Sequence, residues 1–253
     1  MSEPIRVAVA GHRGKVGSVL AAALEADPDF DYVGGVGGGD DLAQFLKERR
    51  PSALVDFTKP ATALHNALAA VATGACPVVG TTGLAADGID KLEVACRAKG
   101  IGGIVAPNFA IGAVLMMHLA EIAAPHFDAA EVIEMHHATK LDAPSGTALS
   151  TAKRLAARRG ARPFSHQKPE KTTLDGTRGG EEGGVGVHSV RLPGFVADQE
   201  VILGLPGQTL TIAHRTTSRE AYVPGVLLAI RIVTSEPRFY RGLDQLLGLG
   251  GPD

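Results

Sequence analysis

The spacing of apolar residues changes once along the chain, and the change divides it into two parts. In the first hundred residues, short apolar runs such as IRVAVAG at 5–11 and ALVDF at 53–57 alternate with segments of helical spacing. One of these, GKVGSVLAAALEADP at 14–28, repeats apolar residues every three or four positions and ends at a proline. Such alternation predicts an α/β fold with a Rossmann-like, doubly wound parallel sheet.

The remaining elements of this first part follow the same rule. Strands are expected at 30–37, 77–83 and 101–109, and helices at 40–50, 60–74 and 84–100. Pro60 opens one of the helices and Gly74 closes it, as is usual for these residue types. We therefore predict that residues 1–108 form one domain.

After Asn108 the pattern predicts a second, α+β domain over 109–216. Helices are expected at 110–127 and 145–160, a strand at 129–137, and further strands at 184–192, 198–205 and 209–217. Consecutive strands with short turns indicate a mixed or antiparallel sheet. The stretch 161–184, with Glu181 and Glu182, is predicted to be a solvated loop. Two apolar helices within 217–253 are expected to pack back onto the first domain.

Composition and charge narrow the range of functions. With 253 residues, a formal net charge of −2 and 45% apolar residues, the chain is typical of a globular protein and unlike a nucleic-acid binder, which would be strongly basic. No apolar run approaches about 18 residues, and no secretory signal precedes the first strand, so we expect no membrane partner and a cytoplasmic location. Only Cys76 and Cys96 are present, without metal-ligand spacing, so no metal is expected.

A glycine-rich turn follows the first strand. In VAVAGHRGKVG, Gly11, Gly14 and Gly17 open the first helix, where backbone N–H groups can bind a pyrophosphate. The spacing differs from the usual GxGxxG at its middle glycine, so glycines that only allow a strand and a helix to pack closely remain an alternative. Three cationic side chains lie in the same turn: His12, Arg13 and Lys15.

The end of the second strand bears on the choice of dinucleotide. An acidic residue usually stands there and binds the adenosine ribose hydroxyls. Here Gly37 or a neighbour takes that place, and Asp40 and Asp41 come a few residues later. Without an acid, a 2′-phosphate meets no repulsion and Lys15 can attract it, so NADPH is expected to be accepted and NADH is not excluded.

The stretch EMHHATKLDAPSGTA, residues 134–148, concentrates polar chemistry in the second domain. A histidine near neutral pH can act as an acid or a hydrogen-bond donor, and Lys140 is a point positive charge. The Ser145–Thr147 turn would present N–H groups of a helix start to an anion. A helix cap in a polar loop is the alternative, but the clustering favours a carboxylate substrate with a proton delivered beside it.

Seven motifs along the chain together resemble one family. They are GHRGKVG, VDFTKP, GTTG, APNFAIG, EMHHATKLDAPSGTA, GVGVHSVRLPG and HRTTSREAYVPGVLLA. From residue 5 to about 249 the chain is similar to the dihydrodipicolinate reductase family of lysine and diaminopimelate biosynthesis. The resemblance implies that NADPH and/or NADH gives a hydride to 4-hydroxy-tetrahydrodipicolinate, a dicarboxylate, which loses water. It also implies a homotetramer built through the second-domain sheets.

The resemblance assigns roles by position. His136 and Lys140 are implied to be the acid–base pair. The residues implied to bind the substrate are His137, Lys140, Ser145, Gly146 and Thr147. Those implied to bind the cofactor are Gly11, His12, Arg13, Gly14, Lys15, Val16, Gly80, Thr81, Thr82, Ala106, Pro107, Asn108, Phe109 and Arg219.

Two other functions are weighed against this one. A semialdehyde dehydrogenase would need a nucleophilic cysteine beside a base, and neither Cys76 nor Cys96 is near the histidine pair in sequence. A non-catalytic nucleotide-binding regulator would keep the glycine turn and would not need His136 or Lys140. Which of His136 and Lys140 donates the proton, which reductant is preferred, how far the domains close and whether the product pathway regulates the chain all stay open at this level.

Overall fold

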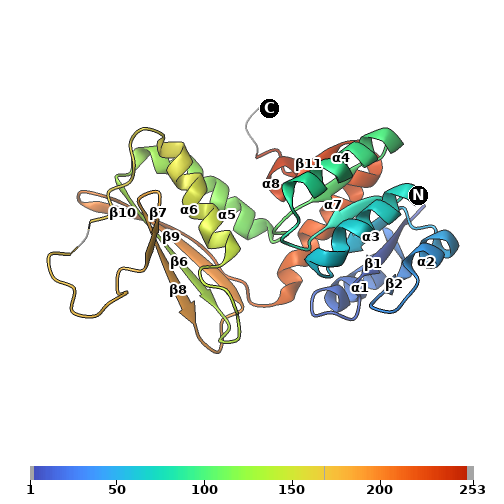
Figure 1. Ribbon diagram of the computed structural model, residues 1–253, viewed down its shortest axis with the longest axis horizontal. Helices are drawn as coiled ribbons and strands as arrows, with labels where there is room; N and C mark the ends of the chain where they lie inside the picture. The colour runs from blue at the N-terminus through green and yellow to red at the C-terminus, as the bar shows by residue number, and fades with distance from the viewer. Residues whose placement is uncertain (1–2, 168, 250–253) are drawn as a thin grey trace. The chain divides into compact units, whose positions relative to one another are not determined.

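A computed structural model describes residues 3–167 and 169–249 of the chain, which fold into two compact units (Figure 1). One unit consists of the residues up to Ile111 together with those from Arg219 onward, and the other is Gly112–Ser218. The second unit is thus inserted into the chain of the first.

The first unit is an α/β sandwich around one parallel sheet. Its strands are β1 (Ile5–Ala10), β2 (Phe30–Val36), β3 (Ala53–Asp56), β4 (Cys76–Val79), β5 (Gly103–Val105) and β11 (Phe239–Arg241). Its helices are α1 (Gly17–Ala26), α2 (Leu42–Arg49), α3 (Pro60–Thr73), α4 (Ala86–Lys99), η2 (Arg219–Tyr222), α7 (Val223–Ser235) and α8 (Leu243–Leu246). The strand order is β11-β5-β4-β3-β1-β2, so the sheet reverses its direction of growth between β1 and β3. This order confirms the doubly wound fold.

Both faces of this sheet are covered, which explains why its central strands are apolar throughout. The four residues of β3 are all buried, as are those of β4. Helix α3 contacts both α2 and α4 in one layer, and α1 contacts α7 in the other. The carboxyl ends of parallel strands meet at one edge, so the turns after β1, β3, β4 and β5 come together there.

Strand β11 corrects the sequence prediction for the chain's end. Phe239, Tyr240 and Arg241 pair in parallel with β5 and add a sixth strand to the expected five. β11 does not lie within a longer apolar run, and the second of the two helices expected within 217–253 is only Leu243–Leu246.

The second unit is a sheet with helices on one face. Its strands are β6 (Ala129–His136), β7 (Gly180–Glu182), β8 (Val185–Arg191), β9 (Ala197–Leu205) and β10 (Gln208–His214), in the order β10-β9-β6-β8-β7. β6 pairs in parallel with β8 and antiparallel with β9, so the sheet is mixed, as predicted. Helices α5 (Ile111–Ala123) and α6 (Gly146–Arg159) pack on one face, and a single turn, η1 (Ala124–His126), follows α5 (Figure 1).

One expectation for this unit was wrong. Glu181 and Glu182 lie in β7, the edge strand that pairs with β8, and not in a solvated loop. Two turn glycines, Gly183 and Gly184, have φ values of 59° and 81° and allow the tight return into β8. With both glutamates polar and the run only three residues long, alternation gave no signal.

Candidate active site

The turn between β1 and α1 has no room for side chains at its glycines. Gly11 has φ 84°, and a Cβ there would lie 2.6 Å from the carbonyl oxygen of Phe57. A Cβ at Gly17 would overlap the carbonyl of Gly11. Among the described residues no side chain caps the N-terminus of α1, whose N-cap is Val16. The turn therefore offers bare N–H groups at a helix start, which is the arrangement that binds a pyrophosphate.

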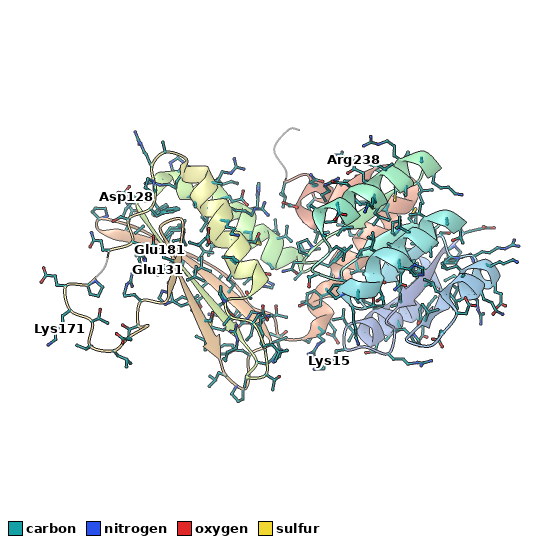
Figure 2. The ribbon with its side chains drawn as sticks, in the orientation of Figure 1. Lys15, Asp128, Glu131, Lys171, Glu181 and Arg238 are labelled. Atoms are coloured by element: carbon teal, nitrogen blue, oxygen red, sulfur yellow. The ribbon has the colours of Figure 1, made fainter. Side chains whose placement is uncertain are left out.

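The three basic side chains of this turn, His12, Arg13 and Lys15, have different surroundings. The ring of His12 packs on Gly35 of β2, and its buried Nδ1 has no hydrogen-bond partner within residues 3–167 and 169–249. Arg13 and Lys15 are exposed, and Lys15 is labelled in Figure 2. His12 is thus part of the packing between β1 and β2, while the other two are available to an anionic ligand.

A carboxylate lies at the end of β2, although it comes from a residue beyond the strand. The Asp40 side chain accepts a hydrogen bond from the N–H of Gly37, with a distance of 2.7 Å between nitrogen and Oδ2. Arg13 lies beside it, with 3.9 Å between Nη2 and the same oxygen. Although Asp40 comes several residues late in the sequence, its carboxylate returns to the end of the strand.

A buried aspartate joins the turns after β3 and β4. Asp56 is 1% exposed and accepts hydrogen bonds from the hydroxyls of Thr58 and Thr81 and from the Asn66 amide, at 2.7–2.8 Å. The N–H of Thr58 in turn donates to Thr81 Oγ1 at 2.8 Å. Sequence reasoning missed Asp56. A carboxylate at the end of an otherwise apolar buried strand was the available signal.

The other residues expected to bind the cofactor lie at the same edge. A Cβ at Gly80 would overlap the Phe57 ring, which lies 6.0 Å from the ring of Phe109. A cavity of about 220 Å³ beside them is lined by Thr81, Thr82, Gly83, Leu84, Ile89, Val105, Pro107 and Arg241. Ala106 is buried, and Asn108 accepts a hydrogen bond from the N–H of Ala110. Arg219 lies on η2, which contacts α1.

In the second unit, a buried glutamate connects the segments of the histidine motif. Glu134, on β6, is 0% exposed. Its Oε2 lies 2.5 Å from Nδ1 of His136, and its Oε1 accepts the N–H of Ser145 at 3.1 Å. Arg191 of β8 donates to both oxygens, at 2.8 and 2.7 Å, and also to the carbonyl of Asp142 at 2.6 Å. Sequence reasoning missed Glu134 entirely.

The predicted substrate-binding turn begins α6. Ser145 is the N-cap, and its hydroxyl oxygen accepts the N–H of Ala148 at 3.1 Å. Since its own N–H donates to Glu134, Ser145 is engaged within the unit. The amides of Gly146 and Thr147, in the first turn of the helix, have no intrahelical acceptor and remain for a ligand.

Lys140 and His137 lie on the loop between β6 and α6. The Lys140 ammonium donates to the exposed carboxylate of Asp142 at 2.6 Å, and the pKa of that carboxyl is lowered by this bond. His137 Nδ1 lies 2.9 Å from the hydroxyl of Thr139. An exposed ion pair is worth about 0–1 kcal/mol, so a substrate carboxylate can replace Asp142 at Lys140.

Burial and hydrogen bonding set the charges of this cluster. Burial lowers the pKa of His136 below 6.5, and the Lys140 and Arg191 charges lower it further, against the raising effect of Glu134. For Glu134, burial raises the pKa, but hydrogen bonds from Arg191, Ser189 and His136 lower it more. At neutral pH, Glu134 is therefore ionised and the His136 ring is uncharged.

Two residues of β8, Arg191 and His188, belong to different clusters. Arg191 contacts the candidate site, whereas His188 belongs to a second cluster around Glu131, three positions before Glu134 on β6. Glu131 Oε2 lies 2.7 Å from His188 Nε2, and Arg178 donates to Oε1 at 2.5 Å. Gly186 of β8 pairs with Glu131 of β6 on one side and with Glu181 of β7 on the other. Figure 2 labels both glutamates. Because side chains alternate along a strand, this cluster lies on the opposite face from Glu134.

The two thiols are not suited to nucleophilic catalysis. Cys76 and Cys96 are free and buried. Burial raises the pKa of Cys76, and burial with the nearby Cys76 and Glu93 raises the pKa of Cys96 to about 12. Neither thiol is a thiolate at neutral pH, whereas nucleophilic cysteines need a lowered pKa.

The described residues also lack two features. Within residues 3–167 and 169–249, no cluster of three or more histidine, cysteine, aspartate or glutamate side chains is placed to hold a metal ion. Over the same residues, no helix has the length and apolar character needed to cross a membrane.

Comparisons with known proteins agree over the whole chain. Residues 5–109 match the family model described as the N-terminus of dihydrodipicolinate reductase, and residues 112–247 match the model of its C-terminus. The 4-hydroxy-tetrahydrodipicolinate reductase of Moorella thermoacetica is 46% identical, over 98% of this chain and 99% of its own. That of Mycolicibacterium smegmatis is 47% identical, over 97% and 100%. The dipicolinate-bound dihydrodipicolinate reductase of Paenisporosarcina sp. TG-14 superposes with a TM-score of 0.88 and 34% identity, over 96% and 99% of the two chains.

Proposed function

This chain belongs to the dihydrodipicolinate reductase family, and from that premise we propose which of its residues carry out the reaction. It is an oxidoreductase that reduces 4-hydroxy-tetrahydrodipicolinate to tetrahydrodipicolinate with NADH or NADPH, with loss of water, in lysine and diaminopimelate biosynthesis. A cysteine-dependent semialdehyde dehydrogenase is not favoured, because both thiols are buried with raised pKa values. A non-catalytic regulator is not favoured either, since the relatives are enzymes by name.

The first unit fits a nicotinamide dinucleotide. The uncapped start of α1 and the glycines at 11, 14 and 17 would hold the pyrophosphate, with Arg13 and Lys15 at its phosphates. Residues of the turns after β4 and β5 would line the nicotinamide side: Gly80, Thr81, Thr82, Ala106, Pro107, Asn108 and Phe109. Arg219 joins them from η2. When bound, the dinucleotide supplies the hydride.

The second unit would hold the dicarboxylate. The free amides of Gly146 and Thr147 and the Lys140 ammonium suit its carboxylates, with His137 beside them. Ser145 supports this turn by capping α6. His136 and Lys140 are the acid–base pair, since both lie on one short segment and both can exchange a proton. The observation that carries this assignment is the joining of His136 to the Ser145 turn through one carboxylate, Glu134.

An assay with fresh substrate tests the proposed residues and the activity together. Oxidation of NADH and of NADPH is followed side by side, and pyridine-2,6-dicarboxylate, a planar mimic of the substrate, is added as an inhibitor. We expect competitive inhibition against the substrate, and nuclear magnetic resonance signals of His136 and His137 that shift when the mimic binds. A mimic that neither competes nor perturbs these signals would refute the assignment of the pocket.

We propose that Asp40 takes the ribose-binding role left open by Gly37, because its carboxylate is placed at the end of β2. Asp40→Asn should weaken NADH use and relieve repulsion of the NADPH 2′-phosphate, which Arg13 and Lys15 attract. A hydrogen bond to a charged group is worth about 1.5 kcal/mol or more, so the ratio of kcat/KM values should move at least about tenfold toward NADPH. Steady-state kinetics with both reductants measure it.

The control for this change is Asp31→Asn. Asp31 lies near the amino end of β2, at the opposite end of the strand from the cofactor-binding edge, and pairs with Arg6. It should leave the ratio of kcat/KM values unchanged. An Asp40→Asn enzyme with the wild-type ratio would show that Asp40 does not contact the ribose.

Assembly and location are also proposals. One face of the second unit's sheet carries α5 and α6, and Leu210 of β10 is exposed. A face without helices supports the homotetramer through this sheet, which analytical ultracentrifugation can test. The two unpaired thiols support a cytoplasmic location, where disulfides are rare.

A further inference from the structure

Glu134 joins three segments of the second unit, which are β6, β8 and the start of α6. Its two oxygens accept hydrogen bonds from His136 of the same strand, from Arg191 and Ser189 of β8, and from the N–H of Ser145 at the start of α6. A carboxylate with 0% exposure and only two oxygens accepts through nearly all of its lone pairs here. No other acid contacts His136 among the residues described.

We propose that Glu134 is a positioning residue that holds His136 in the tautomer protonated at Nδ1 and ties that ring to the Ser145–Thr147 turn, so that Nε2 faces the substrate as a lone-pair acceptor in the resting enzyme. The proposal deepens the function proposed above and rests on it. Glu134 itself need not touch the substrate.

The chemistry of the contact requires this tautomer. An ionised carboxylate is an acceptor only, so the ring nitrogen at 2.5 Å from Oε2 must carry the proton. No described residue partners Nε2, which in the neutral ring is then unprotonated. The charged groups that face the ring are Glu134, Lys140 and Arg191, and together with burial they keep it neutral. In the resting enzyme Lys140 is therefore the member of the pair that holds a transferable proton.

The arrangement also couples proton transfer to substrate binding. Glu134 Oε1 fixes the N–H of Ser145, and Arg191 fixes the carbonyl of Asp142 in the same loop. A movement of the Ser145–Thr147 turn on binding a substrate carboxylate would therefore also move the His136 ring. Replacing the carboxylate that orients the catalytic histidine of a serine protease lowers kcat by about 10⁴-fold.

The wild-type protein provides the first test. Its histidines are labelled with ¹⁵N, and His136 is assigned by comparison with His136→Gln. We expect the Nδ1-protonated tautomer above the midpoint of its titration, and a midpoint below about 6.5. Addition of pyridine-2,6-dicarboxylate should shift Nε2 and leave Nδ1 protonated. A ring protonated at Nε2 alone would overturn the proposal, whether or not any variant folds.

The second test compares two glutamates of the same strand. Glu134→Gln replaces the acceptor-only oxygen by an amide that can donate, so the tautomer should become mixed or reversed. Removing the negative charge should also move the His136 midpoint to lower pH. The value of kcat should fall about 10²-fold or more, as expected when a histidine loses its orienting carboxylate, with a smaller change in KM.

Glu131→Gln is the matched control, because Glu131 also binds a histidine and an arginine, on the other face of β6. It should shift the signals of His188, leave those of His136, and keep kcat within about threefold. A Glu134→Gln protein that retains the wild-type tautomer, midpoint and kcat would overturn the proposal. The ¹⁵N measurements need no turnover, so a failure of the proposed activity would show separately, as a wild-type protein without reductase activity.

Discussion

Lys140→Ala should lower kcat by about 10²–10⁴-fold, because the variant loses the ammonium that both attracts a substrate carboxylate and carries the transferable proton. In the structure Lys140 holds only the exposed carboxylate of Asp142, so its removal leaves no buried charge and the fold should survive. Steady-state kinetics at saturating reductant measure the loss. A kcat within threefold of wild type would show that Lys140 is not part of the acid–base pair.

Two further substitutions separate binding from proton transfer. Lys140→Arg keeps the positive charge but not a readily transferable proton, because arginine stays protonated. Compared with Lys140→Ala, its KM for the substrate should return toward the wild-type value, while kcat stays low. Lys153→Ala, which removes an exposed lysine from α6, should leave both constants unchanged. Equal recovery of kcat and KM in Lys140→Arg would assign Lys140 to binding alone.

Arg191→Leu should lower the free energy of unfolding by about 3–5 kcal/mol. The guanidinium neutralises Glu134, which has no exposure, through two hydrogen bonds. Removal of one partner leaves an uncompensated buried charge, the costly case for ion pairs. Urea denaturation at pH 7 measures the loss. The control is Lys91→Leu, which breaks an ion pair with Asp87 in which both side chains are exposed and should leave the free energy of unfolding nearly unchanged.

The loss of unfolding free energy in Arg191→Leu should become smaller as the pH is lowered. In the wild type the pKa of Glu134 is lowered from 4.5, so the pair stabilises the fold above that pH and the benefit disappears as pH falls through the lowered pKa. In Arg191→Leu, burial instead raises the Glu134 pKa, so the variant regains stability as the carboxyl takes up a proton. A difference between the two proteins that is constant from pH 7 to pH 4 would contradict this account of the pair.

The sequence predicts the sheets where the pattern is long and fails where it is short. Five strands of the first unit and the mixed sheet of the second follow from runs of alternating or continuous apolar residues. β7 and β11 have three residues each and, unlike the equally short β5, do not lie within a longer apolar run. Their positions are set by pairing with β8 and β5. Such pairing is a tertiary contact, so it cannot be read from the few residues around each strand.

The candidate site divides in the same way. The glycine turn and the residues of EMHHATKLDAPSGTA are local, so their spacing alone predicts them. Glu134 belongs to that motif, yet its role depends on Arg191, which lies 57 residues away in the chain. Asp40 shows the converse: counted along β2 it comes too late, but a turn returns its carboxylate to the strand end. The sequence therefore identifies the candidate site residues but does not show which side chains they bond to in the fold.

The insertion of the second unit between β5 and η2 has a consequence for biosynthesis of the protein. The ribosome synthesises residues 112–218 before α7 and β11. At that stage the inserted unit has all its strands, but β5 of the first unit's sheet still lacks its partner β11. Unpaired strand edges favour association between nascent chains. The last strand to emerge, Phe239–Arg241, covers β5 and becomes the edge strand in its place, and early termination of translation upstream of it leaves β5 uncovered.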